Sequence, residues 1–257
     1  MAAIRGMEIF KNHFRDFHEQ YVLIGGVASS LSADELAVEF RTTKDFDIVL
    51  IIEALNTQFV SHFWDFVHAG GYKIRQVGEA GHEKPIFYRF QNPEDESFPQ
   101  QLELFSRTPE GLNHPESATL TPIPTDESVS SLSAILLDKA YYEFLLEGRK
   151  VGNDISYIGA DRLIPFKARA WLDLSARKEA GDSVDSKSIR KHRNDVIVLS
   201  GLLDGSAVSL SASIALDMEA FLQKLAAESL DLKSLGVRQP LSAIIQRLES
   251  IYLPGQP

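Results

Sequence analysis

Two aspartates, Asp45 and Asp47, begin the apolar run KDFDIVLII. Alternate residues of a strand point to the same face, so both carboxylates project together, with Cα atoms about 7 Å apart. Like charges this close repel each other, and Mg²⁺ relieves the repulsion because it prefers oxygen ligands and shares them with substrate phosphates. Exposed acids on an edge strand are the alternative, but the apolar run that follows is typical of a central strand. The pair therefore predicts a magnesium site.

A third acid, Glu103, lies in QLELFS between two leucines. In a strand, its side chain faces away from both of them. Phosphoryl transfer with two metal ions clamps the attacking and the leaving oxygens, and a third carboxylate supplies a further ligand. A half-exposed strand explains an acid at this position about equally well.

Two glycines, Gly25 and Gly26, end the short apolar run YVLI ahead of an expected helix. Glycine lets a phosphate approach the backbone, and a helix N-terminus offers free N–H groups to it. Ser29 adds a hydroxyl in the same region. An ordinary turn also ends a strand on glycines, so this signal is weak by itself.

The elements that must position these residues mix helices and strands over the first hundred residues. We expect an early amphipathic helix and another that closes at Gly70. We also expect a strand before the glycines, a central strand after the aspartates, and a later hairpin around NPEDESFP. The expected helices are residues 4–20, 27–36 and 59–67, and the expected strands are residues 21–24, 46–52, 72–77, 86–91 and 101–106.

The second half of the chain is expected to be helical. The proline-rich residues 109–125 predict a linker, and only helices are expected from Asp126 onward. Pro165 suits the start of one of them. The others are expected over residues 133–146, 186–203, 213–227 and 241–252. We therefore expect an α/β domain over residues 1–120 and an α-helical domain over residues 121–257.

Composition narrows the class of protein. The 257 residues carry a formal net charge of −10, which disfavours a surface coated with nucleic acid, and contain no cysteine for a disulfide or thiolate site. No run approaches the ~20 apolar residues of a membrane span, so we expect a cytoplasmic protein without membrane contact. Residues 162–193 form a local exception, with nine Lys or Arg against four Asp or Glu. A solvated helix face explains that excess most simply.

These motifs occur in an order that resembles the nucleotidyltransferases of the DNA polymerase β type. The text LIGGVAS…FRTTKDFDIVLI is most similar to the AbiEii-type nucleotidyltransferases of type IV toxin–antitoxin systems. Those proteins read Gly-Gly-x-Ala, then Arg-x-Thr or Arg-x-Ser, then Asp-x-Asp. In this chain, Arg41 precedes the two aspartates. LIPFKARAWLDLSARK and KHRNDVIVLSGLL are similar to the family's helical part, with Lys167 and Asp195 at the matching positions, and Asn194 stands where a lysine is common.

The resemblance implies an α+β fold, with a mixed sheet flanked by helices and an α-helical C-terminal domain. It also implies transfer of a nucleoside monophosphate from an NTP to the hydroxyl of an RNA 3′ end or a protein, with pyrophosphate released and an antitoxin as a possible partner. Asp45, Asp47 and Glu103 would be catalytic and would bind one or two Mg²⁺ ions. The nucleotide would contact Gly25, Gly26, Ser29, Arg41, Lys167 and Asp195.

Two other functions stay open. A non-catalytic relative of the same fold would bind a nucleotide or a partner protein, although this chain keeps all three candidate acids. A glycosyltransferase would also use Asp-x-Asp to bind a metal–nucleotide-sugar complex, but the Gly25–Gly26 turn and the helical second half fit that function poorly.

Overall fold

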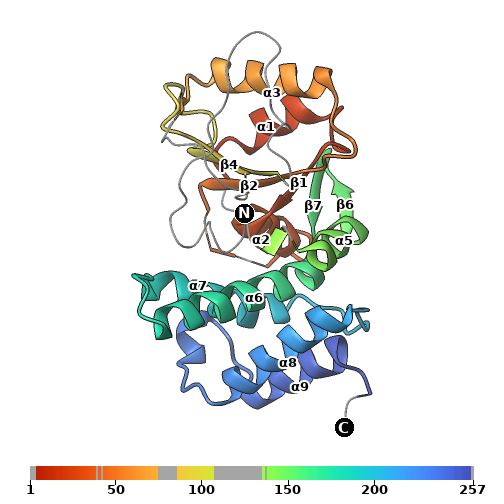
Figure 1. Ribbon diagram of the computed structural model, residues 1–257, viewed down its shortest axis with the longest axis vertical. Helices are drawn as coiled ribbons and strands as arrows, with labels where there is room; N and C mark the ends of the chain where they lie inside the picture. Colours follow the sequence, from red (N-terminus) through yellow and green to blue (C-terminus); the bar gives the residue numbers. More distant parts are fainter. Residues whose placement is uncertain are drawn as a thin grey trace. The chain divides into compact units, whose positions relative to one another are not determined.

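The computed structural model describes residues 4–38, 40–41, 43–74, 86–106, 135–136 and 138–255. The chain packs as two units, one of Met1–Asp126 with Arg149–Gly159 and one of Glu127–Gly148 with Ala160–Pro257 (Figure 1). The linker expected over residues 109–125 and the domain boundary expected at residue 120 lie outside the described residues. No helix in the described part of the chain combines the length and apolar character needed to cross a bilayer.

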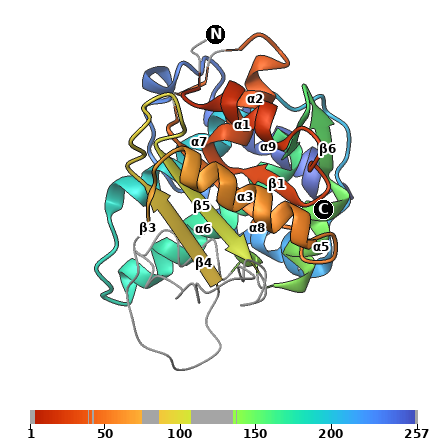
Figure 2. The same ribbon diagram turned by 90° about the horizontal axis from the view of Figure 1, so that it is seen from above.

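The first unit is built on one mixed sheet. Its described strands form a seven-stranded sheet in the order β3-β4-β5-β2-β1-β7-β6. Figure 2 shows β3, β4 and β5 side by side. β2 is a central strand, as the apolar run predicted, and the structure pairs it antiparallel to β1 and parallel to β5. The elements are α1 (Met7–Phe14), β1 (Tyr21–Ile24), α2 (Gly25–Asp34), β2 (Asp45–Leu50), α3 (Thr57–Ala69), β3 (Lys73–Ile74), β4 (Ile86–Gln91), β5 (Gln101–Ser106), β6 (Arg149–Gly152) and β7 (Ile155–Ile158).

The two faces of this sheet differ in character. α1 and α3 cover one face of the sheet (Figure 1). Phe46, Phe90 and Leu102 are buried and share one face, since Leu102 pairs with both phenylalanines. The ring of Phe10 on α1 lies 5.2 Å from that of Phe46, and the ring of Phe63 on α3 lies 5.6 Å from that of Phe90. Because side chains alternate along a strand, the neighbours of these residues point to the opposite face, where α2 packs against β2.

A β-hairpin joins this sheet from a part of the chain where only helices were expected, so that expectation was wrong for β6 and β7. Asn153 and Asp154 connect the two strands with φ values of 50° and 60°. Two consecutive residues at positive φ make the turn type that matches the twist of a tight hairpin, and Asn and Asp tolerate it best after glycine. β7 then pairs in parallel with β1, Leu23 opposite Tyr157.

The second unit is helical, and the expected α+β class is confirmed. α6 packs against α7 and α8, and α9 packs against α7 and α8. Trp171 lies in this core with its ring 5.3 Å from that of Phe221, as its apolar neighbours predicted. The elements are α5 (Lys139–Glu147), α6 (Ala160–Glu179), α7 (Ser186–Ser200), α8 (Ala212–Ala226), the 3-10 helix η2 (Leu232–Leu235) and α9 (Leu241–Tyr252).

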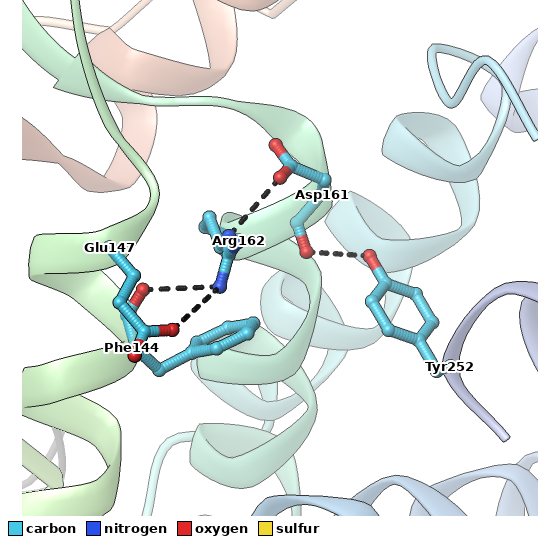
Figure 3. Close-up of polar contacts among 5 residues, drawn as sticks. All are labelled: Phe144, Glu147, Asp161, Arg162 and Tyr252. Carbon is cyan, nitrogen blue, oxygen red and sulfur yellow. Dashed lines mark hydrogen bonds and ion pairs between the residues drawn. The ribbon is translucent and has the colours of Figure 1, made fainter. Parts of the chain in front are cut away.

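Pro165 lies inside α6, so its expected position at a helix start was wrong. Proline has no N–H, and the carbonyl four residues earlier, that of Asp161, loses its usual donor. The hydroxyl of Tyr252 on α9 donates to that carbonyl at 2.7 Å (Figure 3). Arg162 adds a link to α5, with its guanidinium carbon 4.3 Å from the ring centre of Phe144. The tertiary contact with Tyr252 explains how the helix continues through the proline.

Candidate functional site

Strand register brings three charged side chains into one row. Asp47 on β2 pairs with Glu103 on β5, and Glu103 pairs with Arg89 on β4. All three point to the face opposite Phe46, Leu102 and Phe90. Asp45 lies two residues before Asp47 and therefore on the same face. The three candidate acids thus belong to one patch on adjacent strands, which the sequence spacing alone did not determine.

The start of α2 abuts Asp47. Gly25 is the first residue of α2 and has a φ of +63°, and a Cβ built on it would lie 1.7 Å from Asp47 Oδ2. At Gly26 a Cβ would lie 2.6 Å from Thr43 Oγ1. Both glycines are therefore required by close approach, and the first also by its backbone conformation. The result is a carboxylate at a helix N-terminus, where the helix dipole favours negative charge.

Glu103 is buried, with 7% of its surface exposed. Its Oε1 accepts hydrogen bonds from Arg89 Nε at 3.0 Å and from Gln101 Nε2 at 2.6 Å. Arg89 Nη2 lies 2.9 Å from the same oxygen. One carboxylate oxygen is therefore engaged by three donor groups of β4 and β5.

Burial and like charge act together on Glu103. Burial is the largest cause that raises its pKa to about 9, and the negative charges of Asp47 and Asp45 add to it. Arg89 opposes this shift but does not reverse it. The raised pKa of Glu103 thus reflects its burial first and the nearby carboxylates second.

The donor types at this patch fit Mg²⁺. Asp45 is exposed and Asp47 is half-buried, and both offer the carboxylate oxygens that a hard cation prefers. Among the described residues, no group of three or more His, Asp or Glu side chains is already arranged to hold a metal ion. The interaction of Glu103 with Arg89 and Gln101 is consistent with that finding.

Ser29 and Arg41 were the other expected nucleotide contacts in the first unit. The Ser29 hydroxyl is buried and donates to the carbonyl of Gly25 at 2.7 Å, within the first turn of α2. Arg41 is exposed, and its guanidinium carbon lies 5.7 Å from the ring centre of Phe40. The Ser29 side chain therefore packs at the start of α2, and its hydroxyl donates its hydrogen bond to the backbone.

Lys167 and Asp195 lie together in the second unit. Lys167 Nζ on α6 is 2.8 Å from Asp195 Oδ2 on α7, and both side chains are buried. The ion pair joins two helices that pack along each other. A contact between either residue and a nucleotide stays a prediction.

Arg89 and Gln101 were not identified from the sequence. Arg89 stands in IFYRFQ, and it has the same signal as Glu103, a charged residue within an apolar strand. Only the antiparallel pairing of β4 with β5 brings the two charges together.

Protein-family models give no match to this chain, and curated protein sequences give no significant match. Among solved structures, the chain is similar to the solution structure of the antibiotic-resistance factor ANT(2'')-Ia. The two are 11% identical with a TM-score of 0.35, and the alignment covers 86% of this chain and 94% of that chain. An identity and a TM-score this low leave the function of this chain to be inferred from its own residues.

Proposed function

We propose that this protein is a magnesium-dependent nucleotidyltransferase that moves a nucleoside monophosphate from an NTP to an acceptor hydroxyl. The observation that carries the proposal is the contact between the start of α2 and Asp47, with Glu103 next to Asp47 in the sheet. A helix N-terminus beside a carboxylate cluster brings phosphate-binding N–H groups and metal-binding oxygens to one place.

Each residue then has a stated task. Asp45 and Asp47 would hold Mg²⁺, which when bound neutralises charge on the phosphates of the NTP. The backbone of Gly25 and Gly26 would approach those phosphates. Glu103 would accept the proton of the acceptor hydroxyl or orient that hydroxyl for in-line attack on the α-phosphorus. The protein would contribute position and electrostatics, as is usual for phosphoryl transfer.

The finer assignment follows the resemblance to AbiEii-type nucleotidyltransferases. By this resemblance, the acceptor is an RNA 3′ end or another protein. This chain would act in the cytoplasm as the toxin of a toxin–antitoxin pair, with an antitoxin protein as its partner. The basic residues of α7, between Lys187 and Arg193, favour an acceptor that is a polyanion. The resemblance also makes Lys167 and Asp195 nucleotide contacts, and this assignment stays part of the proposal.

Labelled nucleotides test the reaction class. The protein is incubated with Mg²⁺, an extract of cellular RNA and protein, and each of the four NTPs labelled at the α- or the γ-phosphate. We expect α-label in a macromolecule and γ-label in pyrophosphate. γ-Label in the macromolecule would indicate a kinase and contradict the proposal. Asp47→Asn and excess EDTA are the matched controls that should remove the transfer.

A non-catalytic relative is the second candidate function. The observation that favours it is the engagement of Glu103 Oε1 by Arg89 and Gln101, which occupies an acid that a catalytic site needs. Such a protein would bind an NTP in the presence of Mg²⁺ and transfer nothing. Calorimetric binding without label in any acceptor would therefore select this function.

A further inference from the structure

The partners of Glu103 distinguish it from the other two acids. Arg89 and Gln101 place three donor groups on Oε1, at 2.6 to 3.0 Å. The Arg89 and Glu103 side chains are only 14% and 9% exposed. A largely buried guanidinium on a buried carboxylate is held strongly, because two opposite charges with little access to water are costly to separate.

The order of the strands fixes which charged residues lie on each side of Glu103. β5 lies between β4 and β2, so Arg89 and Asp47 flank Glu103 on its two sides. With Glu103 deprotonated, as its role as a base requires, the charges of Asp45, Asp47 and Glu103 sum to −3, and Arg89 brings the total to −2. One divalent cation balances that charge, and Asp45 and Asp47, at the end of the row away from Arg89, are the acids that would bind it.

We propose that Arg89 is a positioning residue that takes the place of a second cation beside Glu103, so that the site binds one divalent cation instead of two. This inference rests on the proposed function above and makes it more specific. A second cation on Glu103 would have to displace Arg89 and Gln101 from Oε1 or bind within a few ångströms of a guanidinium. Like-charge repulsion opposes either arrangement.

The proposal also assigns a task to Gln101. Gln101 is on the same strand as Glu103 and two residues before it, so both side chains share a face. Its amide and the guanidinium of Arg89 approach one oxygen of Glu103 and fix the orientation of the carboxylate. Glu103 thus presents to an acceptor hydroxyl as an oriented base and not as a shared metal ligand.

Electron paramagnetic resonance of Mn²⁺ tests the number of ions. The full-length protein is mixed with Mn²⁺ and a non-hydrolysable nucleoside triphosphate. Two Mn²⁺ ions at the ~4 Å spacing of two-metal sites couple magnetically, and a single bound ion does not. We expect an uncoupled spectrum from one bound Mn²⁺ per wild-type chain. Arg89→Gln should bind a second Mn²⁺ and show the coupled spectrum, and Arg89→Lys, which keeps the positive charge, should remain uncoupled.

The outcomes separate this inference from the proposed function. A coupled spectrum in the wild type, or an uncoupled one in folded Arg89→Gln, overturns the inference and leaves the nucleotidyltransferase proposal standing. The absence of protein-bound Mn²⁺ in the wild type overturns both. Arg149→Gln is the matched control, since Arg149 belongs to the same sheet and donates to the carbonyl of Glu19. If Arg89→Gln does not fold, the spectra of the wild type and Arg89→Lys still decide between one ion and two.

Discussion

The hydroxyl of Tyr252 donates a hydrogen bond to the carbonyl of Asp161 at 2.7 Å, the carbonyl that Pro165 leaves without its helical donor (Figure 3). Tyr252→Phe should therefore lower the free energy of unfolding by about 0.5–1.5 kcal/mol, because it removes a partly buried hydrogen bond. In a Pro165→Ala background the new N–H can reach the same carbonyl, and the cost of Tyr252→Phe should shrink. Urea unfolding of the wild type, the two single variants and the double variant gives the coupling energy.

Tyr141→Phe is the control for that cycle. Its hydroxyl donates to Asp217 in the same helical unit and does not contact Asp161. Its cost should be the same with Pro165 or Ala at position 165. Equal costs of Tyr252→Phe in the two backgrounds would mean that Tyr252 does not replace the missing donor.

Gly25→Ala should reduce nucleotidyl transfer by about 100-fold or more, because its Cβ would displace the carboxylate of Asp47 and misplaced catalytic groups lose rate at about this scale. Gly181→Ala is the matched control. Gly181 also has a positive φ, +97°, but among the described residues other than its two chain neighbours no atom lies within 4 Å of its Cβ position. Both variants should lose about 1–2 kcal/mol from backbone strain, and only Gly25→Ala should lose transfer. Equal transfer rates would remove Gly25 from the site.

Asp47→Asn should abolish metal-dependent transfer and raise the melting temperature of the metal-free protein. The stabilisation is expected near and above pH 9, where Glu103 is ionised, because one negative charge beside it is removed. A relief of about 1 kcal/mol corresponds to a shift of about 2–4 °C. Asp16→Asn, an exposed aspartate of the same unit, should change neither property. Wild-type transfer by Asp47→Asn would exclude it as a metal ligand.

The stability of the metal-free protein should fall as pH rises from about 4.5 to about 9. Glu103 has a pKa of about 9 in the fold against an ordinary value of 4.5, so in this window the folded chain keeps a proton that the unfolded chain releases. The contribution is complete below pH 4.5 and is lost as pH approaches 9. Glu103→Gln cannot titrate and should flatten this part of the curve, measured by urea unfolding in EDTA. The exposed Glu96→Gln should keep the wild-type slope, and an unchanged slope in Glu103→Gln would contradict the raised pKa.

Lys167→Ala should lower the free energy of unfolding by about 3–5 kcal/mol, because it removes one partner of a buried ion pair. Replacing both partners, as in Lys167→Met with Asp195→Leu, should be nearly neutral for stability. That folded double variant makes the nucleotide prediction measurable. Its affinity for Mg²⁺–NTP, measured by calorimetry, should be weaker than that of the wild type by about 1.5–3 kcal/mol. Equal affinities would restrict the pair to a structural role.

Local pattern was sufficient for several elements of the fold. The apolar run after Asp47 predicted a central strand, and YVLI followed by two glycines predicted a strand that ends where a helix begins. The helix that ends at Gly70 and the hairpin around NPEDESFP also followed from spacing and turn residues. These features depend on contacts within a few residues, so periodicity and turn chemistry report them directly.

Tertiary contacts decided the rest. The register of β2 with β5 and of β5 with β4 sets Glu103 between Asp47 and Arg89, and strand pairing across long sequence separations leaves no local signal. The pairing of β7 with β1 also joins segments that are far apart in the sequence, so local pattern did not predict the β6–β7 hairpin. Helix α6 continues past Pro165, where the hydroxyl of Tyr252, 87 residues later in the sequence, donates to the carbonyl of Asp161. The sequence by itself determined which residues could do chemistry, and only the packing of distant segments determined which of them lie together.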